Sequence, residues 1–306
     1  MIDVIAPLVA ATMVAGTPLM LAGLGLLMNE RSGVINLGSE GMMLMGAITG
    51  FAITLGTGSS VVGFLAAAMV GMLMAAFFAW LTIWLGANQV ATGLALSLFG
   101  MGASAYLGLS YTGDSLIPAR VGIPWLQDIP VIGPALFSHH PLVYGSLALC
   151  VGIAWFLGHT RAGLILRAVG ESPTSAHSLG YNVRRIRLAA VLFGGLCCGL
   201  AGAFMSLVYT PMWAEGMVAG RGWIALALTT FATWRPFRVL AGAYLFGGIT
   251  ILTFHMQAMG VPIASQLLSM LPYIATIVVL VLISRNATWI RLNMPASLGK
   301  HFNPNN

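Results

Sequence analysis

Two short polar segments stand out because each interrupts a long apolar run of the chain. In residues 32–41, SGVINLGSEG, glycines that permit close backbone approach lie among side chains that donate and accept hydrogen bonds. Residues 86–92, GANQVAT, place similar side chains where another apolar run begins. Polar groups at membrane depth usually face a cavity or another helix, so these side chains are candidates for a solute path, with interfacial turns and helix caps as the alternative. The candidates are Asn36, Ser39, Glu40, Asn88, Gln89 and Thr92.

A third polar segment, residues 159–187, is strongly basic. It holds five arginines against the single acidic residue Glu171, a net charge of +4, and basic loops of membrane proteins lie mostly in the cytoplasm. Its stretch ESPTSAHSLG predicts a turn and a short helix that Gly180 ends. Such a helix between two membrane spans could contact a soluble partner; an amphipathic loop held by anionic lipid headgroups is the alternative.

The patterns of common catalytic and metal sites are missing from the sequence. The only lysine is Lys300, so a GxxxxGK[ST] phosphate loop cannot exist and the chain is not itself a P-loop ATPase. His139 and His140 are expected to be solvated loop residues, and His255 a polar contact between helices, with a proton relay as its alternative. We expect no catalytic residue, metal site or cofactor in this chain. Three cysteines in apolar runs are expected to be buried: Cys150, Cys197 and Cys198.

These polar segments sit in an unusually apolar chain. Of its 306 residues 58% are hydrophobic and only 7% are charged, whereas soluble proteins carry about 25% charged residues. The long runs lack the alternation of barrel strands, so they predict membrane-spanning helices. The net charge of +6 could suggest nucleic acid, but in a membrane protein basic residues report orientation, and we expect no nucleic-acid partner.

The expected fold is all-α: a polytopic transmembrane helix bundle of eight to nine spans, forming a single domain over residues 1–306. A ninth apolar run, Trp223 to Trp234, is too short to cross alone and predicts a broken or re-entrant helix. Residues 29–40 form either a cytoplasmic turn or an interruption inside the membrane, which leaves the side of the N-terminus open. Eight full spans are predicted at 5–28, 41–58, 61–85, 89–110, 142–158, 188–210, 239–258 and 266–284.

Three further segments have predicted places. Residues 112–141 have a net charge of −1 and five prolines, so we expect an extracytoplasmic loop that could form a docking platform. Residues 285–306 carry Arg285, Arg291 and Lys300 and are expected to be a cytoplasmic tail. The GxxxG of Gly195 and Gly199 predicts close helix packing.

Three runs carry a resemblance to a known family: ERSGVINLGSEGMMLMGA, GANQVATGLAL, and LRAVGESPTSAHSLGYNVRRIR followed by GGLCCGLAGA. In order and spacing they resemble the membrane permease subunits of bacterial ABC importers, in the nucleoside and simple-sugar branch that is related to ribose and branched-chain amino-acid permeases. The resemblance covers residues 21–285. It favours Asn36 and Glu40 as pathway residues, because VINLGSEG is similar to the family's signature.

The resemblance implies partners. They are a paralogous second permease, in a heterodimer or else a homodimer, a cytoplasmic ATP-binding subunit that holds ATP and Mg²⁺, and an extracytoplasmic solute-binding protein, all at a bacterial plasma (inner) membrane. It also implies a coupling helix that contacts the ATPase. Thr174 and Ser175 replace the family's more usual basic and alanine-rich run, which leaves the individual contacts open. The implied coupling residues are Glu171, Ser172, Pro173, Ala176, His177, Leu179, Gly180 and Tyr181.

The leading hypothesis is therefore a permease subunit of an ABC importer for a nucleoside or nucleobase first and a simple sugar second. The first alternative is a secondary transporter driven by an ion or proton gradient, with Glu40 or His255 as its coupling site, although the chain offers few carboxylates within its apolar runs. The second is a membrane scaffold without transport.

Overall fold

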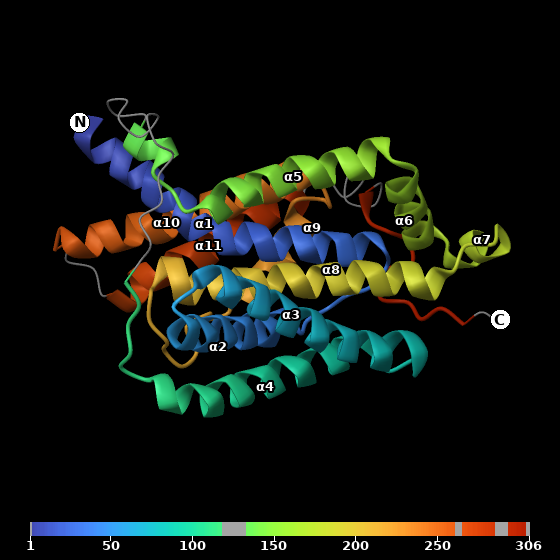
Figure 1. The fold of residues 1–306 in the computed structure, drawn as a ribbon. Helices are drawn as coiled ribbons and strands as arrows, with labels where there is room; N and C mark the ends of the chain where they lie inside the picture. The colour runs from blue at the N-terminus through green and yellow to red at the C-terminus, as the bar shows by residue number, and fades with distance from the viewer. Residues whose placement is uncertain (1, 118–132, 261–264, 285–292, 304–306) are drawn as a thin grey trace.

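The computed structural model describes residues 2–117, 133–260, 265–284 and 293–303. In this part of the chain long helices run side by side along one axis (Figure 1), as the all-α prediction requires. Short π-helical segments extend α3 (η1, Trp80–Trp84) and α8 (η4, Met205–Tyr209), and another, η3, spans Gly133–Phe137. The α-helices are α1 (Ile2–Arg31), α2 (Ser39–Thr57), α3 (Ser60–Ala79), α4 (Gln89–Gly108), α5 (Pro141–His159), α6 (Arg161–Glu171), α7 (Pro173–Ser178), α8 (Val183–Phe204), α9 (Arg221–Phe231), α10 (Pro236–Ala258) and α11 (Ser265–Ser284).

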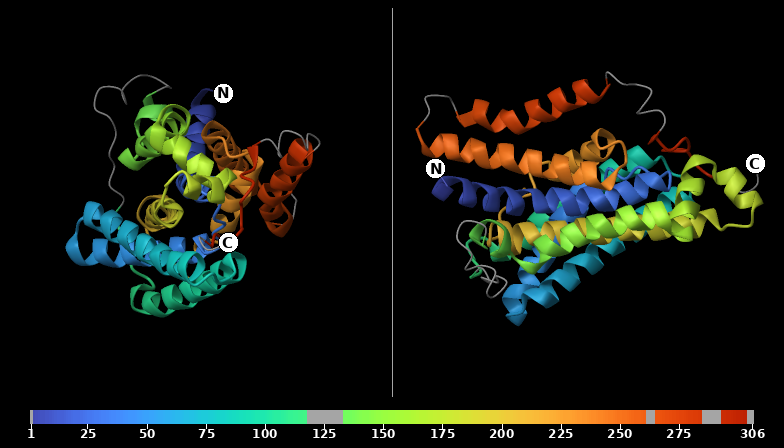
Figure 2. Two further views of the ribbon diagram at one scale, coloured as in Figure 1. Left: turned by 90° about the vertical axis from the view of Figure 1, so that its right-hand side faces the viewer. Right: turned by 90° about the horizontal axis from the view of Figure 1, so that it is seen from above.

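Six of the described helices are long and apolar enough to cross a membrane. Each of these helices contains an apolar stretch of 18 residues. In α1 and α8, 67% of that stretch is buried within the chain, against 28% in α4, α5 and α10. The first two are therefore core helices, and the other three present most of their apolar surface outward, as lipid-facing helices do. Seen along the bundle axis, α8 lies among the other helices (Figure 2, left). The six stretches are Ala6–Arg31, Ser60–Trp84, Gln89–Tyr111, Pro141–His159, Val183–Tyr209 and Pro236–Ala258.

Glycines let α8 approach α2 and α3 at backbone distance. A Cβ atom on Gly199 would lie 2.2 Å from the carbonyl oxygen of Ala67 in α3, and one on Gly46 of α2 would lie 2.5 Å from the carbonyl oxygen of Gly199. Gly71 and Gly195 meet in the same way, since a Cβ on Gly71 would lie 2.2 Å from the Gly195 oxygen. The GxxxG prediction is confirmed: these contacts are too close for any side chain, and packing of this kind holds helices together in lipid.

Every predicted span coincides with a helix, but three helices, α1, α8 and α10, begin three to five residues before the predicted start. Helix α8 begins at Val183, five residues before the predicted start, because three arginines in its first turns lowered the local hydropathy. Helix α10 begins at Pro236, a favourable residue in the first turn, and includes Arg238. The short run that begins at Trp223 forms α9, and the chain then turns through Thr233 and Trp234, both with positive φ.

The segment 159–187, predicted to hold one short helix, holds two, α6 and α7. These helices and residues 293–303 gather at one end of the bundle, here called the α7 end, and α1 begins at the opposite end (Figure 1). Parts of the predicted loop 112–141 and tail 285–306 lie outside the described residues, namely 118–132, which include three of the loop's prolines, and 285–292 and 304–306.

The histidine expectations were wrong. His139 is 4% exposed rather than solvated, because the turn before α5 folds against the bundle. Half-buried His140 caps α5, its Nδ1 accepting the N–H of Leu142 at 3.2 Å, and burial lowers the pKa of His140, which favours the neutral ring that this bond needs. His255 is exposed on α10 instead of lying between helices. The three cysteines are free and buried, as expected.

The helix packing predicts that Gly199→Ala destabilises the protein. The new methyl group would overlap backbone atoms of α3, and overpacking of this kind costs about 1–3 kcal/mol. Gly102→Ala in α4 is the matched control, because a Cβ there meets nothing within 4 Å and the helix gains up to about 1 kcal/mol in propensity. Thermal unfolding in detergent should show a lower midpoint for Gly199→Ala and an unchanged or higher one for Gly102→Ala; equal midpoints would contradict the packing.

Candidate functional site

The structure places Glu40 where the first turns of α2 and α9 meet inside the bundle. Its carboxylate accepts the backbone N–H of Gly220 at 2.8 Å and that of Gly222 at 2.7 Å, and the Glu40 side chain is 3% exposed. Ser39 Oγ donates to the Gly222 carbonyl at 3.0 Å. The first N–H groups of a helix lack partners within the helix and carry partial positive charge, so a carboxylate at this point both satisfies and stabilises α9.

Glycine is required on the α9 side of this contact. A Cβ atom on Gly222 would lie 2.5 Å from the backbone nitrogen of Glu40, and Gly220 has a φ of +80°, which side chains rarely adopt. Next to them, Arg221 lies over the ring of Tyr209 with 5.2 Å from guanidinium carbon to ring centroid. We call this contact between α2 and α9 the Glu40 junction.

The two polar segments singled out in the sequence lie against each other. Gln89 Oε1 accepts the N–H of Ile35 at 2.8 Å, and Ser97 Oγ of α4 donates to the Leu37 carbonyl at 2.7 Å. A Cβ on Gly93 would lie 2.7 Å from the Leu37 nitrogen, so α4 follows the loop 32–38 at backbone distance. The loop and the start of α4 therefore form one polar region that continues to Glu40.

Other predicted path residues make local contacts in this conformation. Asn36 is fully buried and its Oδ1 accepts the Gly38 N–H at 2.9 Å, which closes the turn before α2. Asn88 is exposed and caps α4 through bonds of 3.0 Å from Val90 and Ala91. Thr92 is half-buried in the first turn of α4.

Helix α7 has defined stops at both ends. Ser172 caps it, with Oγ accepting the Ser175 N–H at 3.3 Å, and Pro173 occupies the first turn. At the other end the Gly180 N–H donates to the His177 carbonyl oxygen at 2.8 Å, and the Tyr181 N–H donates to the Ala176 carbonyl oxygen at 3.1 Å. Gly180 itself has a φ of +87°. This is the Schellman arrangement, so the prediction that Gly180 ends the helix is confirmed.

The surface of α7 divides into a buried and an exposed side. Ala176 is 2% exposed and packs with Val169 of α6 and Val183 of α8. Leu179, just past the helix, is 77% exposed. An apolar side chain so exposed at the tip of a projecting helix (Figure 1) is suited to contact another protein.

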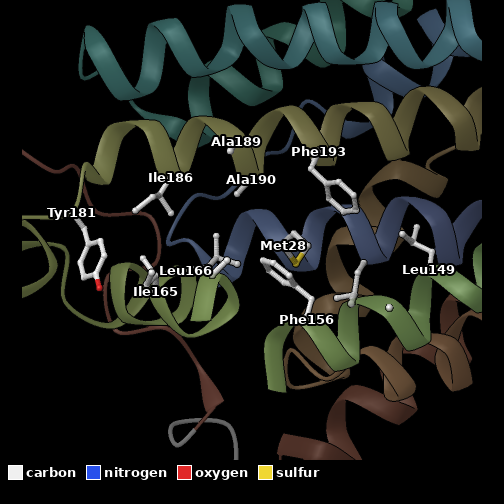
Figure 3. Close-up of a pocket in the computed structure, with 13 residues that line it drawn as sticks. Met28, Leu149, Phe156, Ile165, Leu166, Tyr181, Ile186, Ala189, Ala190 and Phe193 are labelled. Carbon is white, nitrogen blue, oxygen red and sulfur yellow. The ribbon is translucent and has the colours of Figure 1, made fainter. Parts of the chain in front are cut away.

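A cavity of about 630 Å³ lies between α1, α5, α6 and α8, and its walls are apolar. Figure 3 shows Tyr181 at one end of the row of lining side chains and Phe156, Phe193 and Leu149 toward the other. None of the candidate path residues lines it. A hydroxylated solute would lose its hydrogen bonds to water there without replacement, which is unfavourable.

Sequence reasoning missed a group of charged residues at the α7 end, of which Glu30 and Arg187 are buried and Arg31 is half-buried. Glu30 accepts a hydrogen bond from Trp234 Nε1, and Arg31 Nη2 donates to the Trp234 carbonyl at 2.9 Å. Arg187 is 3% exposed and bonds to residues 297 and 300. The sequence did contain a signal, because these charged residues lie directly beside long apolar runs. A charged side chain is costly to bury unless other groups bond to it.

The Glu40 junction predicts that Glu40→Gln loosens the start of α9. An amide has one acceptor oxygen and no charge, so one of the two N–H groups loses its partner, and a hydrogen bond to a charged group contributes roughly 1.5–3 kcal/mol. Hydrogen exchange read by mass spectrometry should show about tenfold or faster exchange at 220–222. Glu215→Gln, an exposed carboxylate of the preceding loop, is the control. Equal exchange in both variants would exclude this role.

Comparison with known proteins adds the family. Residues 8–283 match the model of the branched-chain amino acid transport system permease component. The chain is 39% identical to the putative glucose ABC transporter permease protein TsgC13 of Haloferax volcanii, over 97% of this chain and 98% of that protein. It is 35% identical to the nucleoside ABC transporter permease protein NupC of Lactococcus lactis (90% and 91% covered) and 33% identical to the guanosine ABC transporter permease protein NupQ of Bacillus subtilis (91% and 92%).

No solved structure matches the chain. The family match covers nearly all of α1 to α11, including the Glu40 junction and α7. The chain therefore belongs to the branched-chain amino acid transport system permease family and is a permease subunit of an ABC transporter.

Proposed function

We propose that this chain forms a translocation path for a nucleoside or nucleobase, or for a simple sugar, and that ATP hydrolysis in partner subunits drives import. The observation that carries the proposal is α7, a short capped helix that projects from one end of the bundle with Leu179 exposed at its tip. A permease whose only lysine is Lys300 has no phosphate loop, so the ATP that drives it has to be bound by another protein. ATP and Mg²⁺ then belong to that partner.

The relatives support the solute class. They are named for glucose, nucleosides and guanosine, all of which are neutral and rich in hydroxyl groups. Such solutes need hydrogen-bonding side chains along the path, and the apolar cavity of Figure 3 does not offer them. The polar region of Asn36, Ser39, Glu40, Asn88, Gln89 and Thr92 does, and we assign the path or its gate to these residues. Opening the bundle would break their present contacts and turn their polar atoms toward solute.

Nine crossings account for the arrangement of the helices. To the six apolar stretches we add α2, α11 and the segment from Thr210 through α9. The α7 end then lies in the cytoplasm, since the basic segment 159–187 is there, and α1 begins outside. An odd number of crossings places residues 293–303 on the same side as α7, in agreement with their contacts.

The proposed assembly pairs this chain with a paralogous permease, a cytoplasmic ATP-binding subunit and an extracytoplasmic solute-binding protein in a bacterial plasma membrane. Helix α4 is a candidate surface for the second permease. It packs mainly on α2, and it exposes Leu98 and Phe99, each 65% exposed. When ATP draws the two ATPase subunits together, α7 would move and shift the bundle between outward-open and inward-open states. ATP can do this only by favouring one state over the other.

The ion-coupled alternative depends on Glu40, since His255 is exposed on α10. A coupling carboxylate has to bind and release its ion in each cycle, whereas Glu40 holds the start of α9 through two N–H groups. This favours a structural and gating role for Glu40 over ion coupling.

The energy source is tested by uptake into proteoliposomes that contain both permeases, the ATP-binding subunit and the solute-binding protein. Uptake of radiolabelled nucleoside should require ATP, should persist when proton and sodium gradients are collapsed, and should be competed by the preferred solute class. Competition by glucose alone would assign the sugar. Uptake driven by an ion gradient without nucleotide would overturn the proposal.

The role of α7 is tested by Ser178→Pro. Proline lacks the N–H of the last turn and clashes with the turn before it, so α7 should unwind, and ATP hydrolysis should no longer be linked to uptake. Ser178→Ala is the control at the same position, because among the described residues Ser178 Oγ bonds only to the Thr174 carbonyl of its own helix, and its loss leaves the helix intact. Normal uptake per ATP in Ser178→Pro would exclude α7 as the coupling element.

A further inference from the structure

Residues 293–303 cross the α7 end of the bundle, and buried Arg187 holds them there. We call these residues the strap. The guanidinium of Arg187 donates through Nη1 to the Lys300 carbonyl at 3.1 Å and through Nη2 to Ser297 Oγ at 3.2 Å. Its Nε donates to the Ser32 carbonyl at 3.1 Å. One side chain from the start of α8 thus joins the strap to the turn that follows α1.

The strap also bonds directly to the end of α6 and to the turn that follows α1. Ser297 Oγ donates to the Gly170 carbonyl at 2.6 Å, and the Ala296 N–H donates to Glu171 Oε2 at 3.3 Å, so the strap is fixed to the last residues of α6. On the other side, the Gly299 N–H donates to the Gly33 carbonyl at 3.0 Å. A Cβ on Gly33 would lie 2.6 Å from Ser297 Oγ and 2.9 Å from Arg187 Nη2, so this contact leaves no room for a side chain.

The strap reaches α7 as well. The ring of Phe302 lies 5.5 Å from that of His177, centroid to centroid, in an edge-on arrangement. Phe302 also packs against the small buried cluster of Val169, Ala176 and Val183, which joins α6, α7 and α8. A displacement of α7 therefore presses on the strap through an aromatic contact and through the end of α6.

From the turn at Gly33 the contacts continue to the Glu40 junction within a few residues. Ile35 is held by Gln89, the Asn36 side chain closes the next turn, and α2 begins at Ser39. This route is short and its links are hydrogen bonds of defined geometry. It connects the exposed end of α7 with the predicted path residues without passing along the length of any membrane-spanning helix.

The burial of Arg187 supports a positional role. Within the described residues Arg187 makes three bonds, all to neutral oxygens, and taking a guanidinium out of water is costly even when it is fully bonded. Packing alone would be served as well by an apolar side chain of similar volume. A planar group with several fixed donors is suited to hold several chain segments in one geometry.

We propose that Arg187 is a positioning residue for transport: through Ser297 and the strap it links α7 to the turn before α2, so that movement of α7 reaches the Glu40 junction. The inference rests on the proposed coupling role of α7. It gives residues 293–303 a part in the transport cycle. A cycle carried by the membrane helices alone would not require these residues.

The link itself is tested on the intact chain in lipid nanodiscs, without partners. Arg187→Gln should raise hydrogen exchange at 296–300 and 33–35 by about tenfold, as expected for losing a charged hydrogen bond, while exchange along α3 and α8 stays slow. Lys300→Gln is the matched control: it also removes one positive charge, but Arg187 bonds to the Lys300 backbone carbonyl and not to its side chain. Unchanged exchange in Arg187→Gln would overturn the inference.

Its part in transport is tested in the complete transporter. Arg187→Gln should leave the rate of ATP hydrolysis nearly unchanged. It should raise the number of ATP molecules hydrolysed per solute imported by about fivefold or more, which is the size of typical coupling factors between two sites. Arg187→Lys should restore part of the ratio, and Ser297→Ala should move it in the same direction by less, which covers the case in which Arg187→Gln folds poorly. A structural defect alone would lower both activities together and leave the ratio unchanged, which would overturn the inference. A wild-type transporter without ATP-driven uptake would overturn the proposed function and this inference with it, even if the exchange results held.

Discussion

The arrangement of the bundle depends on one requirement, that a backbone N–H buried away from water must find an acceptor. Two helices, α2 and α9, begin inside the bundle, where water cannot supply one. The carboxylate of Glu40 accepts two N–H groups at the start of α9 while belonging to the first turn of α2. One side chain from the first turn of α2 thereby satisfies two of the N–H groups at the start of α9. The two helix starts bring polar side chains into an otherwise apolar bundle, and polar side chains are what a path for a hydroxylated solute requires.

Helix α8 joins this interior to the α7 end. Along its length, glycines at 195 and 199 bring it to backbone distance from α2 and α3. At its start, Arg187 gathers the turn after α1 and the strap. At its glycines, α8 thus contacts its neighbours through backbone atoms, whereas at its start it is held by the long charged side chain of Arg187. Rigid packing in the membrane together with specific bonds at the α7 end is an arrangement in which the whole of α8 would move as a unit.

Much of the architecture could be predicted from composition and hydropathy, because lipid demands long apolar helices and the runs are long enough to locate them. Helix α9 was found as a run too short to cross, and the end of α7 from Gly180. The pairing of Glu40 with Gly220 and Gly222 could not be predicted, since the partners are separated by 180 and 182 residues and backbone N–H groups leave no trace in a sequence. Buried Arg187 was missed for a related reason: its charge was counted toward membrane orientation, while its bonds go to carbonyl and hydroxyl oxygens far along the chain. His139 and His255 were misplaced because local sequence does not report which turns fold against the bundle and which helix ends project beyond it.

The strap also bears on how the protein is made. Arg31 donates to the carbonyl of Asn293, 262 residues further along, and Arg187 to Ser297, 110 residues further along. When the ribosome has delivered α1 and α8 to the insertion machinery, the strap oxygens to which these two guanidinium groups will donate have not yet been synthesised. Until the strap emerges, the N–H groups that it will pair need other acceptors, such as water or lipid headgroups. The bonds that tie α1 and α8 to the strap can therefore form only after nearly the whole chain has been made.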